Sequence, residues 1–250
     1  MSSTPVILVT AGTAGLGAAV TRLFAGHGFR VVINYNSNVD RAVSLLAELR
    51  GANPEKAADY AAIQADLGSL VDVERLVQET YDAMGRIDVI FSNGGWTKFR
   101  DTTSIDDNCF EEDLDRAFAI NVKSHLWLLR AARQHLEQTE GAFITTSSIA
   151  GVRGMGSSLA YSATKAAQIH MVKGLASMVA PKIRVNSVSP GLLQTEWAAR
   201  FSEEQKESHR QGTKLKRFVE IEDVAEQVLG LARSKSMTGV NVIVDAGFTI

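Results

Sequence analysis

The chain has 250 residues, of which 45% are hydrophobic and 22% charged, and this ordinary balance predicts a globular protein with a sizeable core. The formal net charge of −2 gives no reason to expect nucleic acid as a partner, and no apolar run approaches the ~20 residues needed to cross a membrane. Cys109 is the only cysteine, which excludes an intrachain disulfide and a cysteine-rich zinc site. With no signal-peptide pattern at the N-terminus, we expect a cytoplasmic protein without a metal site.

A glycine-rich turn follows the first expected strand. The apolar run 5–10 is typical of a parallel strand buried on both faces, and it passes directly into AGTAGLG at positions 11–17. Apolar residues then repeat at helical spacing as far as Phe24. A tight packing turn would explain the glycines alone. The strand–turn–helix order favours a phosphate-binding loop, because glycines let the backbone approach a pyrophosphate at the helix N-terminus.

The second expected strand, 30–35, bears on the choice between NAD and NADP. A carboxylate closing this strand would bind the adenosine ribose and favour NAD. Asn34 stands there instead and Ser37 follows, so a 2′-phosphate is tolerated. Yet no arginine or lysine lies in the glycine turn or directly after the strand to bind such a phosphate, so the sequence leans to NADP without excluding NAD.

Strands and helices alternate along the remainder of the chain with short connections. This alternation predicts an α/β fold, a doubly wound parallel sheet of about seven strands with helices on both faces, in one domain covering 1–250. Further strands are expected at 60–65, 87–91, 142–146, 183–189 and 240–244, and helices around 42–49, 70–81 and 161–180, from Leu114 onward, and at 222–232.

The long helix expected from Leu114 contains a polar residue beside its apolar stripe. That stripe consists of Leu114, Phe118, Val122, Leu126 and Leu129. Asn121 lies next to it, and a buried amide is costly unless it is paired. We therefore expect a bent helix or a water-holding position at Asn121. The acidic segment 106–115 just before it is expected to be a solvated helix start.

Two further strand ends carry residues of interest. Asp66 and Leu67 follow the third expected strand, where they would lie against an adenine edge, or Asp66 would cap the next helix. Asn93 and Gly94 follow the fourth strand, on the same side of the sheet as the glycine turn. Glycines at that position indicate a backbone that lies against a cofactor.

Tyr161 and Lys165 are four residues apart and therefore share one face of a helix. A lysine held there can lower the pKa of the phenol, and a shift of about 2–3 units would bring it near neutrality. A serine returned by a loop would orient a substrate carbonyl beside the phenol. Ser147 and Ser148 both qualify, and strand alternation points them in opposite directions. The pattern alone is common, and a capped helix start would also explain it.

The segment 192–217 changes character, being polar and charged with isolated aromatic residues. A lid over a bound ligand would have this composition, and so would a pair of surface helices anchored by their aromatics. Trp96, Phe99, Trp197 and Phe201 are candidates to line an apolar substrate pocket, although the same rings would pack equally well inside the lid or against another subunit.

Taken together, these residues resemble the short-chain dehydrogenase/reductase family, over nearly the whole chain. Thr10 to Gly17 is similar to the family's cofactor turn, with Ala11 where a glycine is usual. Serine and tyrosine stand thirteen residues apart, as in its catalytic set. Together with the strand-end residues above, the resemblance implies cofactor contacts at Gly12, Thr13, Gly15, Leu16, Gly17, Asn34, Ser37, Asp66, Leu67, Asn93, Gly94, Tyr161, Lys165, Pro190, Gly191, Leu193 and Thr195. It implies catalytic roles for Asn121, Ser148, Tyr161 and Lys165.

The resemblance implies an NAD(P)-dependent oxidoreductase that interconverts a ketone and a secondary alcohol, similar to 3-oxoacyl reductases. Tyr161 would act as proton donor, Lys165 would lower its pKa, Ser148 would polarise the carbonyl, and Asn121 would anchor a water that supplies protons. An NAD-linked alcohol dehydrogenase and a non-catalytic nucleotide sensor are the alternatives. The helices from Leu114 and at Tyr161 resemble those that pair subunits in this family, which implies a homodimer or homotetramer acting on a small molecule.

Overall fold

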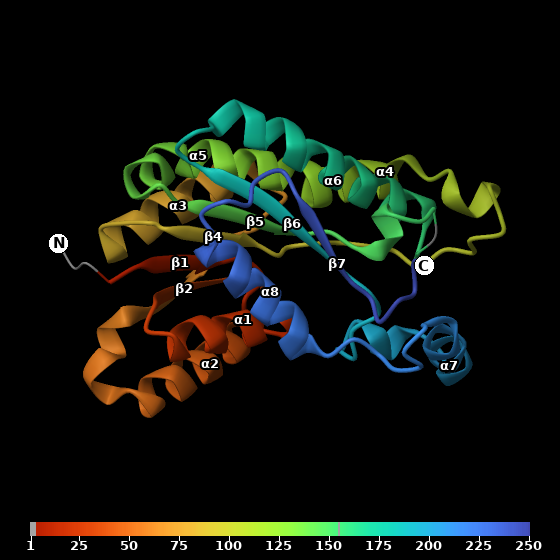
Figure 1. The fold of residues 1–250 in the computed structure, drawn as a ribbon, viewed down its shortest axis with the longest axis horizontal. Helices are drawn as coiled ribbons and strands as arrows, with labels where there is room; N and C mark the ends of the chain where they lie inside the picture. Colours follow the sequence, from red (N-terminus) through yellow and green to blue (C-terminus); the bar gives the residue numbers. More distant parts are fainter. Residues whose placement is uncertain (1–3, 155) are drawn as a thin grey trace.

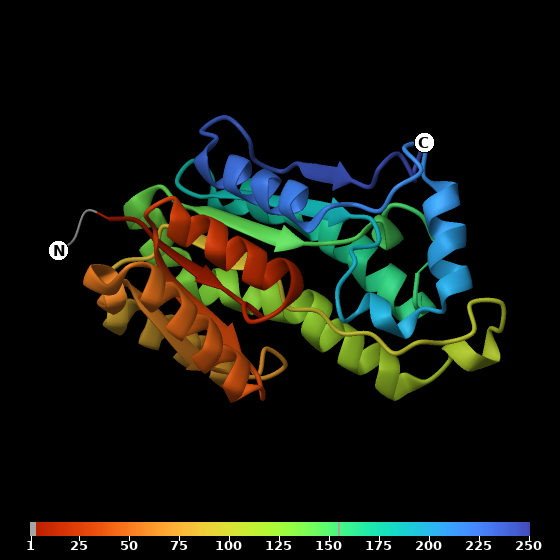
Figure 2. The same ribbon diagram turned by 90° about the horizontal axis from the view of Figure 1, so that it is seen from below.

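The computed structural model of the protein describes residues 4–154 and 156–250. Its centre is a parallel sheet of seven strands in the order β3-β2-β1-β4-β5-β6-β7. The sheet, with its helices on either side, is seen from two directions in Figures 1 and 2. The strands are β1 (Val6–Val9), β2 (Arg30–Tyr35), β3 (Tyr60–Gln64), β4 (Val89–Ser92), β5 (Ala142–Thr146), β6 (Arg184–Pro190) and β7 (Asn241–Val244). The predicted doubly wound α/β fold is confirmed.

The longer helices form two layers around the sheet. On one face lie α3, α5 and α6, with α4 continuing α5, and on the other lie α1, α2 and α8 (Figure 1). Their bounds are α1 (Gly15–Gly26), α2 (Val39–Ala52), α3 (Leu70–Met84), α4 (Glu111–Phe118), α5 (Ser124–Thr139), α6 (Leu159–Val179), α7 (Glu203–Gly212) and α8 (Ile221–Arg233). Short helical turns complete the set: η1 (Pro54–Asp59), η2 (Asp106–Asn108), η3 (Ala119–Lys123), η4 (Ile149–Gly151) and η5 (Ala198–Arg200).

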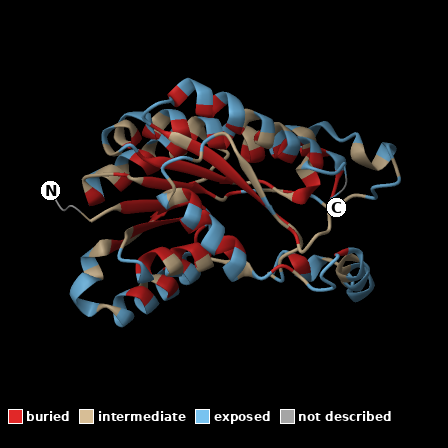
Figure 3. Ribbon diagram, viewed as in Figure 1, coloured by how far each residue is buried: buried red, intermediate tan, exposed pale blue. Residues whose placement is uncertain are grey.

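The alternation of side chains along each strand divides the core in two. In β1, Ile7 and Val9 face α1 and α8, whereas Val6 and Leu8 face α3 and α5. All four residues are fully buried, which explains why the strand is a continuous apolar run. Buried residues concentrate on the strands in Figure 3, and α7 at the end of the molecule has no buried residue.

The carboxyl ends of the parallel strands meet at one edge of the sheet, where the candidate site lies. The chain runs from β1 to β2 and β3 on one side and then returns to β4 on the other side of β1. This reversal between β1 and β4 opens a crevice at the strand ends, which is where open α/β sheets bind ligands. Four of the expected site segments follow β1, β4, β5 and β6 directly.

The prediction of a single long helix from Leu114 is wrong in one respect. The chain forms α4, then the π-helical turn η3 (Ala119–Lys123), then α5. Phe118 and Leu126 of the expected buried stripe are 37% and 43% exposed, because residues spaced four apart drift around a helix with 3.6 residues per turn. The buried face instead carries Ala117, Ile120, Asn121, Ser124, His125, Leu128 and Leu129. Asn121, where a bent helix or a water-holding position was expected, lies in the π turn.

No helix within the described ranges is both long and apolar enough to span a membrane. Within the same ranges, no three histidine, cysteine or acidic side chains gather in a group able to hold a metal ion. The acidic segment contributes instead to the first turn of α4, where Glu111, Glu112 and Asp113 lie at the positive end of the helix.

Candidate active site

The glycine turn lies between β1 and α1, packed against the neighbouring strand end. A Cβ at Gly17 would collide with the carbonyl of Ala11 and lie 2.9 Å from the side-chain nitrogen Nδ2 of Asn93. Only glycine permits this close approach of α1 to the turn, which leaves the helix N-terminus open to a ligand. Thr10 Oγ1 accepts hydrogen bonds from the backbone N–H groups of Asn93 (2.9 Å) and Gly94 (3.3 Å) and so joins the two strand ends.

Ala11, which replaces the expected first glycine, adopts a left-handed backbone with φ of 47°. A residue with a Cβ is strained in this region, by about 1–2 kcal/mol. The neighbouring contacts hold it there: the N–H of Ala11 donates to Asn34 Oδ1 (3.2 Å), and the N–H of Gly12 donates to the carbonyl of Asn34 (2.9 Å). Both contacts tie the turn around Ala11 to the end of β2.

These contacts correct the role expected for Asn34. Its side chain is 1% exposed, and besides accepting from Ala11 its amide nitrogen donates to the carbonyls of Ile63 (3.4 Å) and Ala65 (3.2 Å). A side chain engaged in this way supports the turn and the end of β3 and does not reach a ligand. Ser37, by contrast, is exposed.

Asp66 and Leu67 occupy the loop between β3 and α3. Asp66 Oδ1 accepts from the N–H of Gly68 (2.8 Å), a local turn, while the helix cap is Ser69, which accepts from the N–H of Asp72 (3.3 Å). Of the two roles considered for Asp66, the helix cap is therefore wrong. Leu67 lies directly against Gly94, so the loops after β3 and β4 meet beside the crevice.

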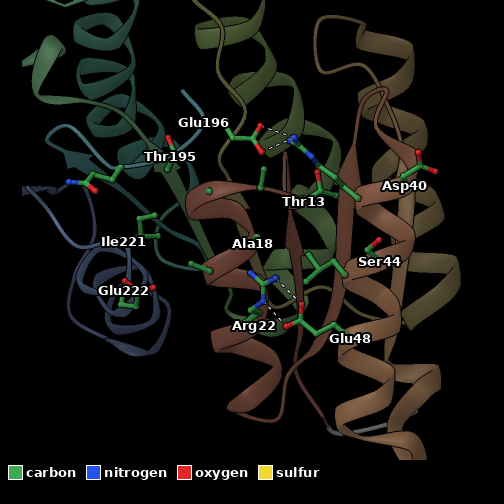
Figure 4. A pocket seen from close by; sticks show the side chains of 16 residues that line it. Thr13, Ala18, Arg22, Asp40, Ser44, Glu48, Thr195, Glu196, Ile221 and Glu222 are labelled. Carbon is green, nitrogen blue, oxygen red and sulfur yellow. Dashed lines mark hydrogen bonds and ion pairs between the residues drawn. The ribbon is translucent and has the colours of Figure 1, made fainter. Parts of the chain in front are cut away.

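A cavity of about 610 Å³ opens beside the glycine turn, between α1, α2 and residues 194–196 (Figure 4). Its walls include Thr13, Gly15 and Thr195, three of the expected cofactor contacts. Arg41, from the first turn of α2, also lines it and pairs with Glu196 at 2.7 Å. The sequence prediction missed Arg41 because it lies six residues beyond the end of β2, and only the start of α2 brings it back to the turn.

The chain after β6 folds back over the glycine turn. Pro190 ends β6, Gly191 donates its N–H to the carbonyl of Val244 (2.9 Å), and Leu193 forms a bridge with Val219. Thr195 then lies against Gly15, at 3.1 Å from the position a Cβ would take there. The expected contacts at 190–195 and in the glycine turn thus come together.

Ser148 follows β5 and faces the tyrosine. Its Oγ accepts from the N–H of Ala150 (3.1 Å), and a hydrogen bond between Ser148 and Tyr161 acts to lower the pKa of the phenol. Gly151 makes this possible, since a Cβ there would lie 2.5 Å from the backbone of Lys165 in α6. Ser147 points the other way, is buried, and donates to the carbonyl of Lys165 (3.0 Å). The alternation along the strand therefore selects Ser148.

The pKa of Tyr161 departs from the expectation. Burial raises it to about 12, and the hydrogen bond with Ser148 opposes this less strongly. The ammonium of Lys165 lies 5.8 Å from the centroid of the tyrosine ring, and burial lowers the pKa of Lys165 to about 7. The expected lowering of the tyrosine pKa is thus absent in the free protein, because burial of the phenol is the dominant effect on it.

Lys165 is 3% exposed and is held by two acceptors. Its Nζ donates to the carbonyl of Thr146 (2.7 Å) and to Oε1 of Gln168 (3.1 Å). Thr146 in turn donates from Oγ1 to Oδ1 of Asn93 (2.9 Å), which joins the lysine to the end of β4 and the glycine turn. The catalytic candidates and the phosphate-binding candidates therefore border one crevice.

Asn121 is fully buried in the π turn, and both ends of its amide are engaged. Oδ1 accepts from the N–H of Trp96 (2.7 Å), while Nδ2 donates to the carbonyl of Trp96 and to Thr164 Oγ1, each at 2.9 Å. A Cβ at Gly95 would lie 3.7 Å from both Asn121 Oδ1 and Lys165 Nζ, so the two side chains face one loop. The side chain of Asn121 anchors that loop.

Aromatic residues connect segment 192–217 to this crevice. The rings of Phe99 and Phe201 meet edge to face with centroids 4.9 Å apart, and Trp197 lies 6.0 Å from Tyr161. Farther out, Phe248 stacks on His209 of α7 at 4.2 Å. Three of the four aromatics expected to line a pocket, Phe99, Trp197 and Phe201, thus each lie beside another aromatic ring.

The comparisons with known proteins agree with this architecture. A family model described as enoyl-(acyl carrier protein) reductase matches residues 10–249. The chain is 34% identical over 249 residues to a protein assigned as ketoacyl reductase 2 of the granaticin polyketide synthase from Streptomyces violaceoruber, with 97% of this chain and 95% of that one covered. It is 30% identical over 255 residues to a 3-oxoacyl-(acyl-carrier-protein) reductase from Staphylococcus aureus, with 99% of each covered.

A solved structure is similar throughout. A short-chain dehydrogenase from Burkholderia cenocepacia in complex with NADP superposes with a TM-score of 0.88 at 28% identity, covering 98% of this chain and 97% of that one. Fold, site and relatives together define an oxidoreductase built on a Rossmann sheet. The chain belongs to the short-chain dehydrogenase/reductase family.

Proposed function

We propose that the protein is an NADPH-dependent carbonyl reductase that interconverts a ketone and a secondary alcohol. The observation that carries this proposal is the meeting of Ser148, Tyr161 and Lys165 in a crevice whose other wall is the glycine turn. The turn fits a dinucleotide, because Gly17 and the left-handed Ala11 leave the N-terminus of α1 open to a pyrophosphate. A nicotinamide dinucleotide, when bound, supplies the hydride in reduction and accepts it in oxidation.

Within this proposal, Tyr161 is the proton donor to the ketone oxygen. Its pKa of about 12 keeps the phenol protonated at neutral pH, which is the form that a general acid requires. Ser148 already hydrogen-bonds Tyr161, so one carbonyl oxygen can accept from both hydroxyls. Lys165 holds positive charge near the phenol and favours the phenolate that remains once the proton has left.

The cofactor preference rests on the first turn of α2. No carboxylate closes β2, Ser37 is exposed, and Arg41 lines the cavity beside Thr13. A 2′-phosphate is a stronger partner for a guanidinium than an exposed carboxylate is, since the Arg41–Glu196 pair is 42% and 72% exposed. We therefore propose NADPH as the preferred cofactor, with Arg41 released from Glu196 to bind it.

The substrate class is proposed from the relatives and from the aromatic contacts. Both curated relatives are named for ketoacyl or 3-oxoacyl reduction. Segment 192–217 is proposed as the lid, because Trp197 and Phe201 reach from it to Tyr161 and Phe99. A 3-oxoacyl thioester, with its ketone at Tyr161 and its chain along these rings, is the first substrate to test.

We also propose that the protein forms a homodimer or homotetramer. Phe118 of α4, Leu126 of α5 and Leu159 of α6 are 37%, 43% and 57% exposed and belong to one helical layer of the molecule. Exposed apolar side chains gathered on one side favour association with a second copy.

The substitution Tyr161→Phe tests the function, because it keeps the ring and removes only the donated proton. We expect the rate of NADPH oxidation with a 3-oxoacyl thioester to fall by at least about a hundredfold, the usual contribution of general acid catalysis. NADPH binding, followed by its fluorescence, serves as the control and should change little. Near-normal turnover by the variant would exclude Tyr161 as the donor. A wild-type protein that binds NADPH but reduces no ketone would favour the nucleotide sensor.

A further inference from the structure

A chain of buried polar side chains extends from Lys165 away from the crevice and into the helical layer. Gln168 lies one turn along α6 from Lys165, His125 lies in α5, and Ser92 ends β4. Gln168 and His125 are fully buried, and Ser92 is 2% exposed. Gln168 Nε2 lies 3.0 Å from His125 Nε2, and His125 Nδ1 lies 2.6 Å from Ser92 Oγ. The proposed reaction uses none of these three residues.

The direction of every hydrogen bond in this chain follows from the lysine. An ammonium only donates, so the atom of Gln168 that faces Lys165 is the amide oxygen, at 3.1 Å. The amide nitrogen then donates to Nε2 of His125, which must lack a proton. The proton of the neutral imidazole is therefore on Nδ1, where it donates to Ser92.

The surroundings make a charged imidazole unfavourable. Burial lowers the pKa of His125 to about 3, and repulsion by Lys165 adds to this effect. Ser92 reaches His125 because alternation along β4 places it on the same face as Ile90, toward α5. The imidazole thus stays neutral throughout the working pH range and acts as a fixed acceptor for Gln168.

The groups around the lysine ammonium come from several elements. Tyr161 of α6 and His125 of α5 are the ionisable ones, β5 contributes the carbonyl of Thr146, and the π turn contributes the neutral Asn121. No carboxylate among the described residues forms an ion pair with Lys165, and burial is the only cause resolved for its lowered pKa. Gln168 is therefore the one side chain that accepts a hydrogen bond from the ammonium within the described structure.

We propose that Gln168, supported by His125 and Ser92, is a positioning residue that fixes the direction of the Lys165 ammonium and favours its charged form. With two of its protons committed to Gln168 and Thr146, the ammonium has one donor left for the crevice. Loss of the Gln168 acceptor would leave the ammonium freer to turn and easier to deprotonate. The hydrogen bonds among Gln168, His125 and Ser92 do not depend on the reaction, whereas the effect of Gln168 on turnover rests on the proposed function.

The first test reads the imidazole in the absence of cofactor. In ¹⁵N-histidine-labelled protein, with the His125 signals assigned by their loss in His125→Asn, we expect the tautomer with the proton on Nδ1. Gln168→Glu presents a carboxylate of nearly the same shape, which accepts from both Lys165 and His125, so the proton should move to Nε2. Gln134→Glu, an exposed residue of α5, is the control for the added charge and should change nothing. An unchanged tautomer in Gln168→Glu would overturn the inference.

The second test reads the lysine. Its apparent pKa is measured from the ¹³Cε signal of labelled protein, assigned by its absence in Lys165→Met. A carboxylate at hydrogen-bond distance raises the pKa of a lysine by about 1–3 units, so Gln168→Glu should show an upward shift of that size. Gln168→Leu should shift it downward, and Gln168→Glu carries the test alone if the leucine variant does not fold. Equal pKa values in wild type and Gln168→Glu would contradict the proposal.

The pH profile of kcat/KM connects the chain to turnover. If turnover requires charged Lys165, the alkaline limb of the profile should move to higher pH in Gln168→Glu and to lower pH in Gln168→Leu. A merely structural role would not produce this response. A profile that stays in place while the lysine pKa moves would refute the effect on turnover. If no variant reduces a ketone but the tautomer still switches, the proposed reaction fails and the positioning of Lys165 stands.

Discussion

The two sides of the candidate active site are built in opposite ways. On the inner side, Asn121, His125, Lys165 and Gln168 are at most 3% exposed, and hydrogen bonds to α5, α6 and the strand ends hold each of them. On the outer side, Trp197 is 37% exposed, and none of the ten residues of α7 is buried. Few contacts tie this outer segment to the body, among them Arg41–Glu196 and Phe99–Phe201.

The difference separates two tasks. Groups that transfer protons must be placed to within a fraction of an ångström, and a buried network with every amide engaged provides that placement. A segment that admits substrate must open, and elements with few buried contacts open at low cost in free energy. We therefore expect substitutions on the inner side to change pKa values and stability, and substitutions on the outer side to change binding.

The largest effect is expected from Lys165→Met on the inner side. Lys165 has a pKa of about 7 in the folded protein, against about 10.4 for an unfolded lysine. Between these values the unfolded chain binds a proton that the folded one lacks, so this group makes wild type more stable as pH rises, by up to about 1.4 kcal/mol per pH unit. The Lys165→Met variant lacks this contribution. The free energy of unfolding of the variant minus that of wild type should therefore decrease from pH 7 to pH 10.

Urea unfolding of both proteins at four pH values between 7 and 10 measures this difference, and the other titrating groups cancel in the comparison. A constant difference in the free energy of unfolding across that range would show that the buried lysine keeps an ordinary pKa. The inner side would then not differ from the outer side in the way described.

Arg41→Ala tests the residue that pairs with Glu196 of the outer segment and lines the cavity beside the glycine turn. Loss of a charge-assisted hydrogen bond to a 2′-phosphate should lower kcat/KM for NADPH about tenfold, equivalent to about 1.4 kcal/mol, with little change for NADH. Arg22→Ala is the matched control, since Arg22 lines the same cavity and pairs with Glu48 (2.7 Å). Equal losses with NADPH and NADH would exclude Arg41 as the phosphate partner.

A double-mutant cycle on Phe99 and Phe201 measures how firmly the outer segment is attached. The edge-to-face pair should couple by about 0.5–1.5 kcal/mol in the binding of an acyl substrate, because its two rings come from opposite walls of the crevice. We expect KM to rise in the single Phe→Ala variants, with smaller changes in kcat. Independent effects of the two substitutions would mean that the rings do not act together on the substrate.

Ala11→Gly addresses strain in the glycine turn and should have the smallest effect. Relief of the left-handed backbone strain at Ala11 is partly offset by the greater freedom of glycine in the unfolded chain, so we expect up to about 1 kcal/mol more stability. Thermal unfolding without cofactor measures it. A lower melting temperature for the glycine variant would indicate that the turn relaxes when Ala11 is replaced.

Much of the fold could be predicted because each element carries its own local signal. β2 and β5 have the bounds expected from their sequences, and the helix after Ser69 has both a serine cap and a left-handed Gly85 at its end. The π turn could not be predicted from the 3.6-residue repeat, because the extra residue leaves each half of the helix with a normal pattern. The exposure of Phe118 and Leu126 follows instead from the four-residue steps of the expected stripe, which drift around a helix of 3.6 residues per turn.

The candidate site residues that the sequence points to are related by spacing along the chain, whereas those that it misses are brought to the candidate site by packing. Tyr161 and Lys165 share a helix face by spacing alone, and the thirteen-residue step to Tyr161 favours Ser148 over Ser147, which points the other way. Arg41 and His125 reach the site from other elements, so nothing local distinguishes them from surface or core residues. Gln168, three residues after Lys165 on the same helix, was the one signal available in the sequence.

The most direct test of ketone reduction is the fate of the transferred hydrogen. NADPH carrying deuterium at the transferable C4 position is incubated with the wild-type protein and a 3-oxoacyl thioester, and the product is analysed by mass spectrometry and NMR. The account predicts a 3-hydroxy product with one deuterium on the carbinol carbon, and almost none of this product from Tyr161→Phe. A protein that leaves the ketone untouched and instead places deuterium on the β-carbon of a 2,3-unsaturated thioester would contradict it.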